Sequence, residues 1–283
     1  MRRKQPVVAL ETSILGQGLP HPHNLRAARG CEVAIEEEGA VAATVAVLDG
    51  QIHIGLEDEE LERVAHASVK VSARDLGAAM AQGATGATTV AATMRAAAMA
   101  GIRFLATGGI GGVHRGHPED QSADLEELSR SPVAVFCAGA KIILDLRLTL
   151  ERLESLGVPV LGYGTDEFPA FYSRHSGCPV SARVDGDAAI AAALHQIWGT
   201  ETPGIVVGVP PPRELEGAEE MARMAASEMS ELSGAGVTPR LLARMAELSE
   251  GRSLDLNVEL VINNARVAAR VAKAYVSRWS RQT

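Results

Sequence analysis

Short apolar runs alternate along the chain with longer segments in which apolar residues recur every three or four positions. The short runs are typical of buried strands, and the longer spacing is that of amphipathic helices. We expect strands, some with the loop that follows, in 6–11, 41–56, 68–72, 102–112, 132–139, 158–172 and 204–215. We expect helices over 25–39, 58–67, 86–101, 122–131 and 140–157, and from about 214 to the end. This alternation favours an α/β fold with a largely parallel sheet.

Turn and cap residues refine this pattern. Asp49-Gly50 is a strong hairpin signal between two β-rich segments, so one strand pair should be antiparallel and the sheet mixed. Asn24 is expected to cap the helix that follows it, and Ser122 to cap another helix whose first turn is acidic. In the C-terminal helical region the only obvious break is at 232–238.

The bulk composition is that of a globular protein. Hydrophobic residues make up 46% of the 283 positions and charged residues 22%, which excludes a disordered chain. Aromatic residues are only 3%, so the core must be built from Ala, Val, Leu and Ile. We expect the whole chain to form one large α/β domain with a mixed, largely parallel sheet and a helical C-terminal region from about 214.

Charge and cysteine usage narrow the function classes. A formal net charge of -8 disfavours a nucleic-acid polymer as partner, because its phosphates would be repelled. The first apolar run is too short for a signal peptide or a membrane span, so a cytoplasmic, non-membrane protein is expected. Cys31, Cys137 and Cys178 are odd in number and lack metal-ligand spacing, which indicates reduced packing thiols.

Polar residues that directly follow apolar strands are the first candidates for chemistry, because ligands of open α/β sheets bind beyond the carboxyl ends of strands. Glu11 ends the first strand, and a carboxylate there needs a partner or a substrate. Lys141 is expected at the start of a helix, where the helix dipole would favour a neutral, nucleophilic amine; an ordinary solvated lysine is the alternative. Lys70 lies in an alternating strand and could equally face solvent.

Three further features remain open on spacing alone. The GGIGG loop at 108–112 lacks the spacing of a known phosphate-binding fingerprint. Asp120 and Asp124 could hold a hard divalent cation together with waters, or simply form a solvated acidic helix start. Asn264 lies on the apolar stripe of the final helix, where its amide needs either substrate or a core hydrogen bond.

Taken together, the motifs resemble those of the pseudouridine-5'-phosphate glycosidases. The similarity runs from about Pro6 to about Ala272. The motifs that carry it are ALETSILGQGLPHPHN, GATTVAATM, ATGGIGGVHRG, SADLEEL, CAGAKIILD, GYGTDEFPAFY and GRSLDLNVELVINNAR. The resemblance implies reversible conversion of pseudouridine 5'-phosphate and water into uracil and ribose 5-phosphate. It also implies a single catalytic three-layer α/β/α domain over 1–283. One Mn²⁺ or similar divalent ion per subunit and a homotrimer are implied as well.

The resemblance implies a role for each residue that matches a family motif. Glu11 would be the proton donor and Lys141 the covalent nucleophile that holds the ribose as an imine. Asp120 would hold the metal. The residues implied to bind substrate are Lys70, Val90, Ser122, Ala123 and Asp124.

The chain departs from the family pattern close to the implied acid. Thr12 and Ser13 stand where the family has Ser-Thr, and Gln17 stands in place of a histidine. Two other functions stay open: a related synthase that condenses a base with a sugar phosphate, and a non-catalytic sugar-phosphate-binding homologue. Retention of both an acid and a nucleophile argues against the binder, which needs neither.

Overall fold

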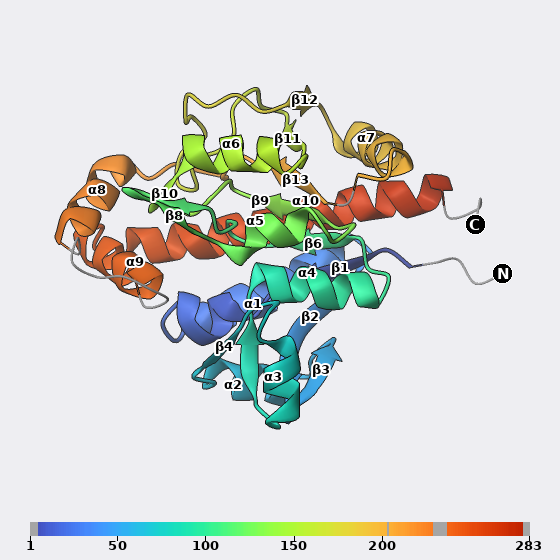
Figure 1. Ribbon diagram of the computed structural model, residues 1–283, viewed down its shortest axis with the longest axis horizontal. Helices are drawn as coiled ribbons and strands as arrows, with labels where there is room; N and C mark the ends of the chain where they lie inside the picture. The colour runs from blue at the N-terminus through green and yellow to red at the C-terminus, as the bar shows by residue number, and fades with distance from the viewer. Residues whose placement is uncertain (1–4, 203, 229–236, 280–283) are drawn as a thin grey trace.

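The computed structural model describes residues 5–202, 204–228 and 237–279 (Figure 1). Within them a sheet of ten strands forms the centre, with β3 (Gln51–Ile54) added beside β2. The other nine run in the order β12 (Ala182–Val184), β11 (Val160–Tyr163), β13 (Ile205–Gly208), β9 (Ala134–Cys137), β6 (Phe104–Ala106), β1 (Val7–Leu10), β2 (Val41–Leu48), β5 (Gly86–Thr88) and β4 (Val69–Val71). The predicted α/β class is confirmed.

The sheet is mixed but largely parallel, as predicted. From β12 to β2 every neighbouring pair is parallel, and β4 is parallel to β5. Only β2 pairs antiparallel, with β3 and with β5. The β2–β3 hairpin turns at Asp49 and Gly50, whose φ angles of 49° and 75° lie in the left-handed region that this turn requires.

Helices cover both faces of the sheet. Figure 1 shows α4 (Val90–Met99) and α5 (Ala123–Leu128) in front of the central strands, and α1 (His23–Glu37) and α10 (Arg252–Trp279) behind them. Both α1 and α7 (Asp187–Gly199) pack on α10, which runs under β6, β1 and β9. The central strands β9 and β13 are fully buried between these layers, which is why they read as continuous apolar runs.

The remaining elements lie around these layers. A small antiparallel sheet joins β10 (Leu144–Asp145), β7 (Val113–His114) and β8 (His117–Gln121). The other helices are η1 (Ile14–Gly18), α2 (Asp58–Ala65), α3 (Leu76–Ala81), α6 (Leu146–Ser155), α8 (Ala218–Glu228) and α9 (Val237–Leu248). Within the described residues, no helix combines the length and apolarity needed to cross a bilayer. Cys31 and Cys137 are buried and Cys178 is half-buried, and all three are free thiols.

Two predictions about helix starts are wrong. Helix α1 begins at His23, and Asn24 lies inside it with its side-chain amide donating to Leu15 O at 3.0 Å rather than capping. Helix α6 begins at Leu146, because a turn and the short strand β10 separate it from Lys141. Ser122, by contrast, caps α5 as predicted, accepting from the backbone of Asp124.

Two further segments differ from expectation. The alanine-rich segment 86–101 is not helical throughout, because 86–88 forms β5 between β2 and β4. After β13 the chain is helical as predicted, but a break separates α9 from α10 at Glu250 and Gly251, both with positive φ. The predicted break at 232–238 falls largely outside the described residues.

Gly139 shows how tightly the loop after β9 packs. Its φ is 91°, and an added Cβ would lie 1.7 Å from Pro169 O. We expect Gly139→Ala to lower the free energy of unfolding by about 2–5 kcal/mol, because strain and overlap add. Gly157→Ala is the matched control, since Gly157 also has positive φ (70°) but nothing within 4 Å, and it should cost only about 1–2 kcal/mol. Equal losses in urea denaturation would contradict this packing.

Candidate functional site

Three parallel strands bring the candidate residues to one edge of the sheet. Strand β6 pairs with β1 on one side and with β9 on the other. Glu11 follows β1, the segment 107–109 follows β6, and Lys141 lies four residues after the end of β9. Because carboxyl ends of parallel strands share an edge, these loops meet, as the sequence predicted for an open α/β sheet.

Glu11 is held in one orientation by three donors. Its side chain is buried, with 8% exposure. Its Oε2 accepts from Ser13 Oγ at 2.7 Å and from Ile14 N at 3.1 Å, and its Oε1 accepts from Thr107 Oγ1 at 3.3 Å. A carboxyl group fixed in this way can present a proton to a ligand without reorienting.

Glu11, Lys70 and Lys141 line one cavity. The cavity lies between the carboxyl edge of the sheet and the helices η1, α9 and α10. Its full lining is Glu11, Ser13, Ile14, Gln17, Gly18, Lys70, Thr107, Gly108, Gly109, Lys141, Phe171, Leu242 and Asn257. An acid and two amines, the groups that the sequence singled out from distant positions, therefore share one space.

The backbone around Lys141 is fixed by hydrogen bonds. Lys141 N donates to Ile110 O at 3.1 Å, and Leu144 N closes a turn onto Lys141 O at 2.9 Å. The Arg115 guanidinium donates to the carbonyls of Ile142 and Leu144 at 3.1 and 3.0 Å. Lys141 therefore stands on a braced turn rather than at a helix start, and the predicted helix-dipole effect on its amine does not apply.

Lys70 has a perturbed amine. Its pKa is lowered from the usual lysine value, first by burial of the ammonium and then by the positive charge of Lys141. The negative charges of Asp124 and Glu11 oppose this shift. The residue as a whole is exposed on the outer strand β4, but its side chain lines the cavity. The charges of Lys141, Asp124 and Glu11 therefore all act on the Lys70 amine.

Asp124 does not line the cavity, because both of its oxygens hold backbone amides. Its Oδ1 accepts from Ala91 N at 2.9 Å and its Oδ2 from Gly111 N at 2.8 Å. It thus ties the first turn of α4 to the glycine loop after β6. Val90, the first residue of α4, is 2% exposed and also lies outside the cavity lining.

The remaining predicted residues also lie outside the cavity lining. Ser122 is the cap of α5, and Ala123 is its exposed first residue. Asp120 is exposed on β8, with its Oδ2 3.3 Å from His114 Nδ1. Among the described residues no group of three His, Cys, Asp or Glu side chains could hold a metal. A divalent ion at Asp120 would therefore need waters or substrate oxygens as further ligands.

Comparison with known proteins assigns the chain to a family. A family model described as indigoidine synthase A like protein matches residues 1–274. The chain belongs to the indigoidine synthase A-like family. The resemblance to pseudouridine-5'-phosphate glycosidases is confirmed by relatives that carry this name. The protein from Herpetosiphon aurantiacus is 52% identical, over 95% of this chain and 93% of the relative. The protein from Myxococcus xanthus is 49% identical, over 96% and 93%.

Two solved structures share the fold of this family member. The crystal structure of the prealnumycin C-glycosynthase AlnA in complex with ribulose 5-phosphate matches with a TM-score of 0.89 and 36% identity, over 98% of this chain and 94% of the other. An indigoidine synthase A-like protein from Thermotoga maritima matches with a TM-score of 0.87 and 33% identity, over 96% and 94%.

Sequence reasoning assigned no role to several residues that line the cavity of this family member. Thr107 and Ser13 donate to Glu11, while Phe171, Leu242 and Asn257 form part of the wall. Motifs that carried the resemblance contain Phe171 and Asn257, but only contacts between distant segments give them a role. Asn264 is a core amide: it is fully buried and donates to Thr107 O at 2.8 Å, outside the cavity lining.

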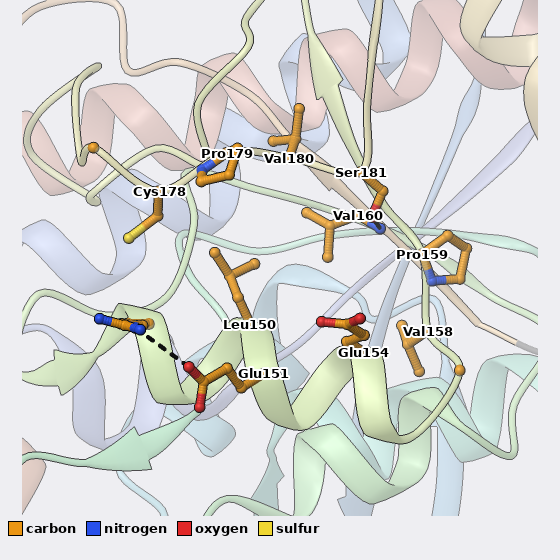
Figure 2. A pocket seen from close by; sticks show the side chains of 13 residues that line it. Leu150, Glu151, Glu154, Val158, Pro159, Val160, Cys178, Pro179, Val180 and Ser181 are labelled. Carbon is orange, nitrogen blue, oxygen red and sulfur yellow. Dashed lines mark hydrogen bonds and ion pairs between the residues drawn. The ribbon is translucent and has the colours of Figure 1, made fainter.

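A second hollow lies away from this cavity. Figure 2 shows it between α6 and the segments 157–160 and 177–181, with Leu150, Val160 and Val180 pointing towards one another. Glu151, which forms an ion pair with Arg147, lies at one side of the hollow. None of the predicted site residues lines this hollow, so the cavity with Glu11 and Lys141 is the candidate active site.

Replacement of Asp124 tests its part in holding the glycine loop. We expect Asp124→Ala to lower the free energy of unfolding by about 2–5 kcal/mol, since it leaves two backbone amides without an acceptor. Glu126→Ala, in the same helix, should cost less than about 1 kcal/mol, because Glu126 only pairs with Arg130 and Arg152 near the surface. Urea denaturation of both variants is the measurement; similar losses would refute the assigned role.

Proposed function

We propose that this protein is a pseudouridine-5'-phosphate glycosidase, an enzyme that reversibly cleaves pseudouridine 5'-phosphate with water to uracil and ribose 5-phosphate. The observation that carries the proposal is the single cavity that joins Glu11, Lys70 and Lys141. The relatives named for this activity, at about half identity over nearly the whole chain, support it. Catabolism of pseudouridine nucleotide is the corresponding cellular role.

The bond to be broken joins two carbons, so protonating a glycosidic oxygen or nitrogen is not an option. In the proposed reaction Glu11 gives a proton to the ribose ring oxygen as the C1'–O4' bond breaks. The Lys141 amine bonds to C1' and loses a proton. The nitrogen lone pair then forms a C=N bond as the C1'–C5 electron pair leaves with uracil, which takes up a proton at C5. Water hydrolyses the resulting imine to ribose 5-phosphate and the free amine.

The other polar groups of the site would bind and orient the substrate. The Lys70 ammonium, which belongs to the cavity lining, is suited to the dianionic phosphate. Val90, Ser122, Ala123 and Asp124 lie outside the cavity lining, so the role in substrate binding proposed for them is indirect. Asp124 holds the first turn of α4 and the glycine loop through two backbone amides, and Ser122 N donates to Gly112 O in the same loop. The Gly108 and Gly109 backbone directly lines the substrate space.

We also propose that one Mn²⁺ or similar divalent ion per subunit binds at Asp120. Its carboxylate is exposed and has His114 beside it, a donor pair that suits Mn²⁺ once waters or substrate complete the shell. Such an ion would supply positive charge to offset anionic substrate groups. We further propose that the protein is a cytoplasmic homotrimer without membrane or nucleic-acid partners. Analytical ultracentrifugation would test the number of subunits.

A second candidate is a synthase that forms a C-nucleotide from another base. The structural match to a protein named as a C-glycosynthase favours it specifically. The same acid and amine serve both directions, because each step is reversible. Rates measured with uracil and with other bases in the presence of ribose 5-phosphate would separate the two candidates. A non-catalytic sugar-phosphate binder would show no turnover with any base.

The nucleophile can be identified by trapping. Sodium borohydride added during turnover of pseudouridine 5'-phosphate should reduce the imine and attach a ribose phosphate to Lys141. Lys141→Ala should remove the adduct and lower kcat by about 10³-fold or more, since no other amine takes its place. Peptide mass spectrometry is the measurement, and Lys70 in the same cavity is the internal control. An adduct on Lys70 instead would overturn the assignment.

The lowered pKa of Lys70 predicts the alkaline side of the pH profile. Its ammonium loses its proton at a lower pH than an ordinary lysine. Because the charged form binds phosphate, kcat/KM should fall as pH rises through this lowered pKa. Lys70→Arg keeps the charge at all these pH values and should shift that fall upwards by at least about one pH unit. An unchanged alkaline limb in the variant would show that Lys70 does not govern it.

A further inference from the structure

Asn257 of α10 lines the cavity and carries a buried side-chain oxygen without a hydrogen-bond partner among the described residues. The residue is 5% exposed. Its side chain hydrogen-bonds the hydroxyl of Tyr172, while its Oδ1 is the unpaired atom. Leaving a buried acceptor unpaired costs about 1–3 kcal/mol. Such an atom in a binding cavity points to a ligand that supplies the missing donor.

Phe171, next to this amide, is held in a strained backbone conformation. Its φ is 62°, in the left-handed region, and its N donates to Ala138 O at 2.8 Å. Such a conformation costs a bulky residue about 1–3 kcal/mol and is found mainly at functional sites. Gly109 makes room for the ring, because an added Cβ there would lie 2.7 Å from it. The surrounding structure must hold this strained residue, so the ring has a fixed place in the cavity wall.

The acceptor and the ring lie on the same side of Gly108. A Cβ placed on Gly108 would stand 3.4 Å from Asn257 Oδ1 and 3.7 Å from Phe171 Cε2. Leu242 of α9 adds an apolar side chain to this part of the lining. An aromatic ring, an apolar side chain and one hydrogen-bond acceptor together suit a flat heterocycle with an N–H group.

We propose that Phe171, Leu242 and Asn257 form the base subsite, in which Asn257 Oδ1 accepts a hydrogen bond from a ring N–H of uracil. This inference rests on the proposed function and adds the residues that select the base. In pseudouridine the base is joined through carbon, so both of its ring nitrogens keep their hydrogens. The charged sugar phosphate belongs beside Lys70 and Lys141.

Calorimetric titration of the whole protein with uracil, 1-methyluracil and 3-methyluracil tests the subsite without requiring turnover. The wild-type protein should bind one of the two methylated bases about 10- to 100-fold more weakly than uracil. Asn257→Leu should weaken uracil to that level and remove the penalty of methylation at that nitrogen. Asn263→Leu, on the same helix but outside the cavity lining, should behave as the wild type.

Three results would overturn the subsite: no uracil binding by the wild type, equal affinity of the wild type for all three bases, or a methylation penalty that survives in Asn257→Leu. The first two need no variant and so do not depend on variant folding. If the bases bind as expected but pseudouridine 5'-phosphate is not cleaved, the proposed reaction is wrong and the proposed subsite stands. If the protein cleaves pseudouridine 5'-phosphate but Asn257→Leu keeps the methylation penalty, only the proposed subsite is wrong.

Discussion

The parallel pairing of β1, β6 and β9 is the constraint on which the rest of the site depends. These strands end at one edge of the sheet, so Glu11, Thr107 and Lys141 arrive there from segments far apart in the chain. The pairing register also decides which face each side chain occupies, because successive residues of a strand point to opposite faces. Asn264 locks this arrangement from α10, since its amide donates to the carbonyls of Thr107 and Gly108.

The polar groups around the cavity divide into those that the fold already satisfies and those that it leaves free. Glu11 is held by three donors, and Asp124 by two backbone amides. The Lys70 amine and the side-chain oxygen of Asn257 are not satisfied in this way. Burial and the charge of Lys141 lower the pKa of the amine. The oxygen has no hydrogen-bond partner among the described residues. Satisfied groups keep the site rigid, while unsatisfied ones hold the free energy that a ligand can recover on binding.

The proposed chemistry is compatible with both kinds of activity named among the protein's relatives. Relatives are named as glycosidases of pseudouridine 5'-phosphate, and a structural neighbour as a C-glycosynthase. An acid and an amine at the sugar serve cleavage and synthesis alike, because every proposed step is reversible. In our proposal the identity of the base is then set at the other end of the cavity, by Phe171, Leu242 and Asn257.

The sequence by itself determined the local features: the buried strands, the Asp49-Gly50 hairpin, the Ser122 cap, and Glu11 as a carboxylate after a strand. These depend on side-chain period and turn chemistry, which act over a few residues. It did not determine that 86–88 is a strand or that Lys141 stands on a turn, because both depend on pairing with distant segments. Only the tertiary structure decided that Asn257 and Phe171 lie together on one side of Gly108. Such contacts join residues far apart in the chain, and no local pattern records them.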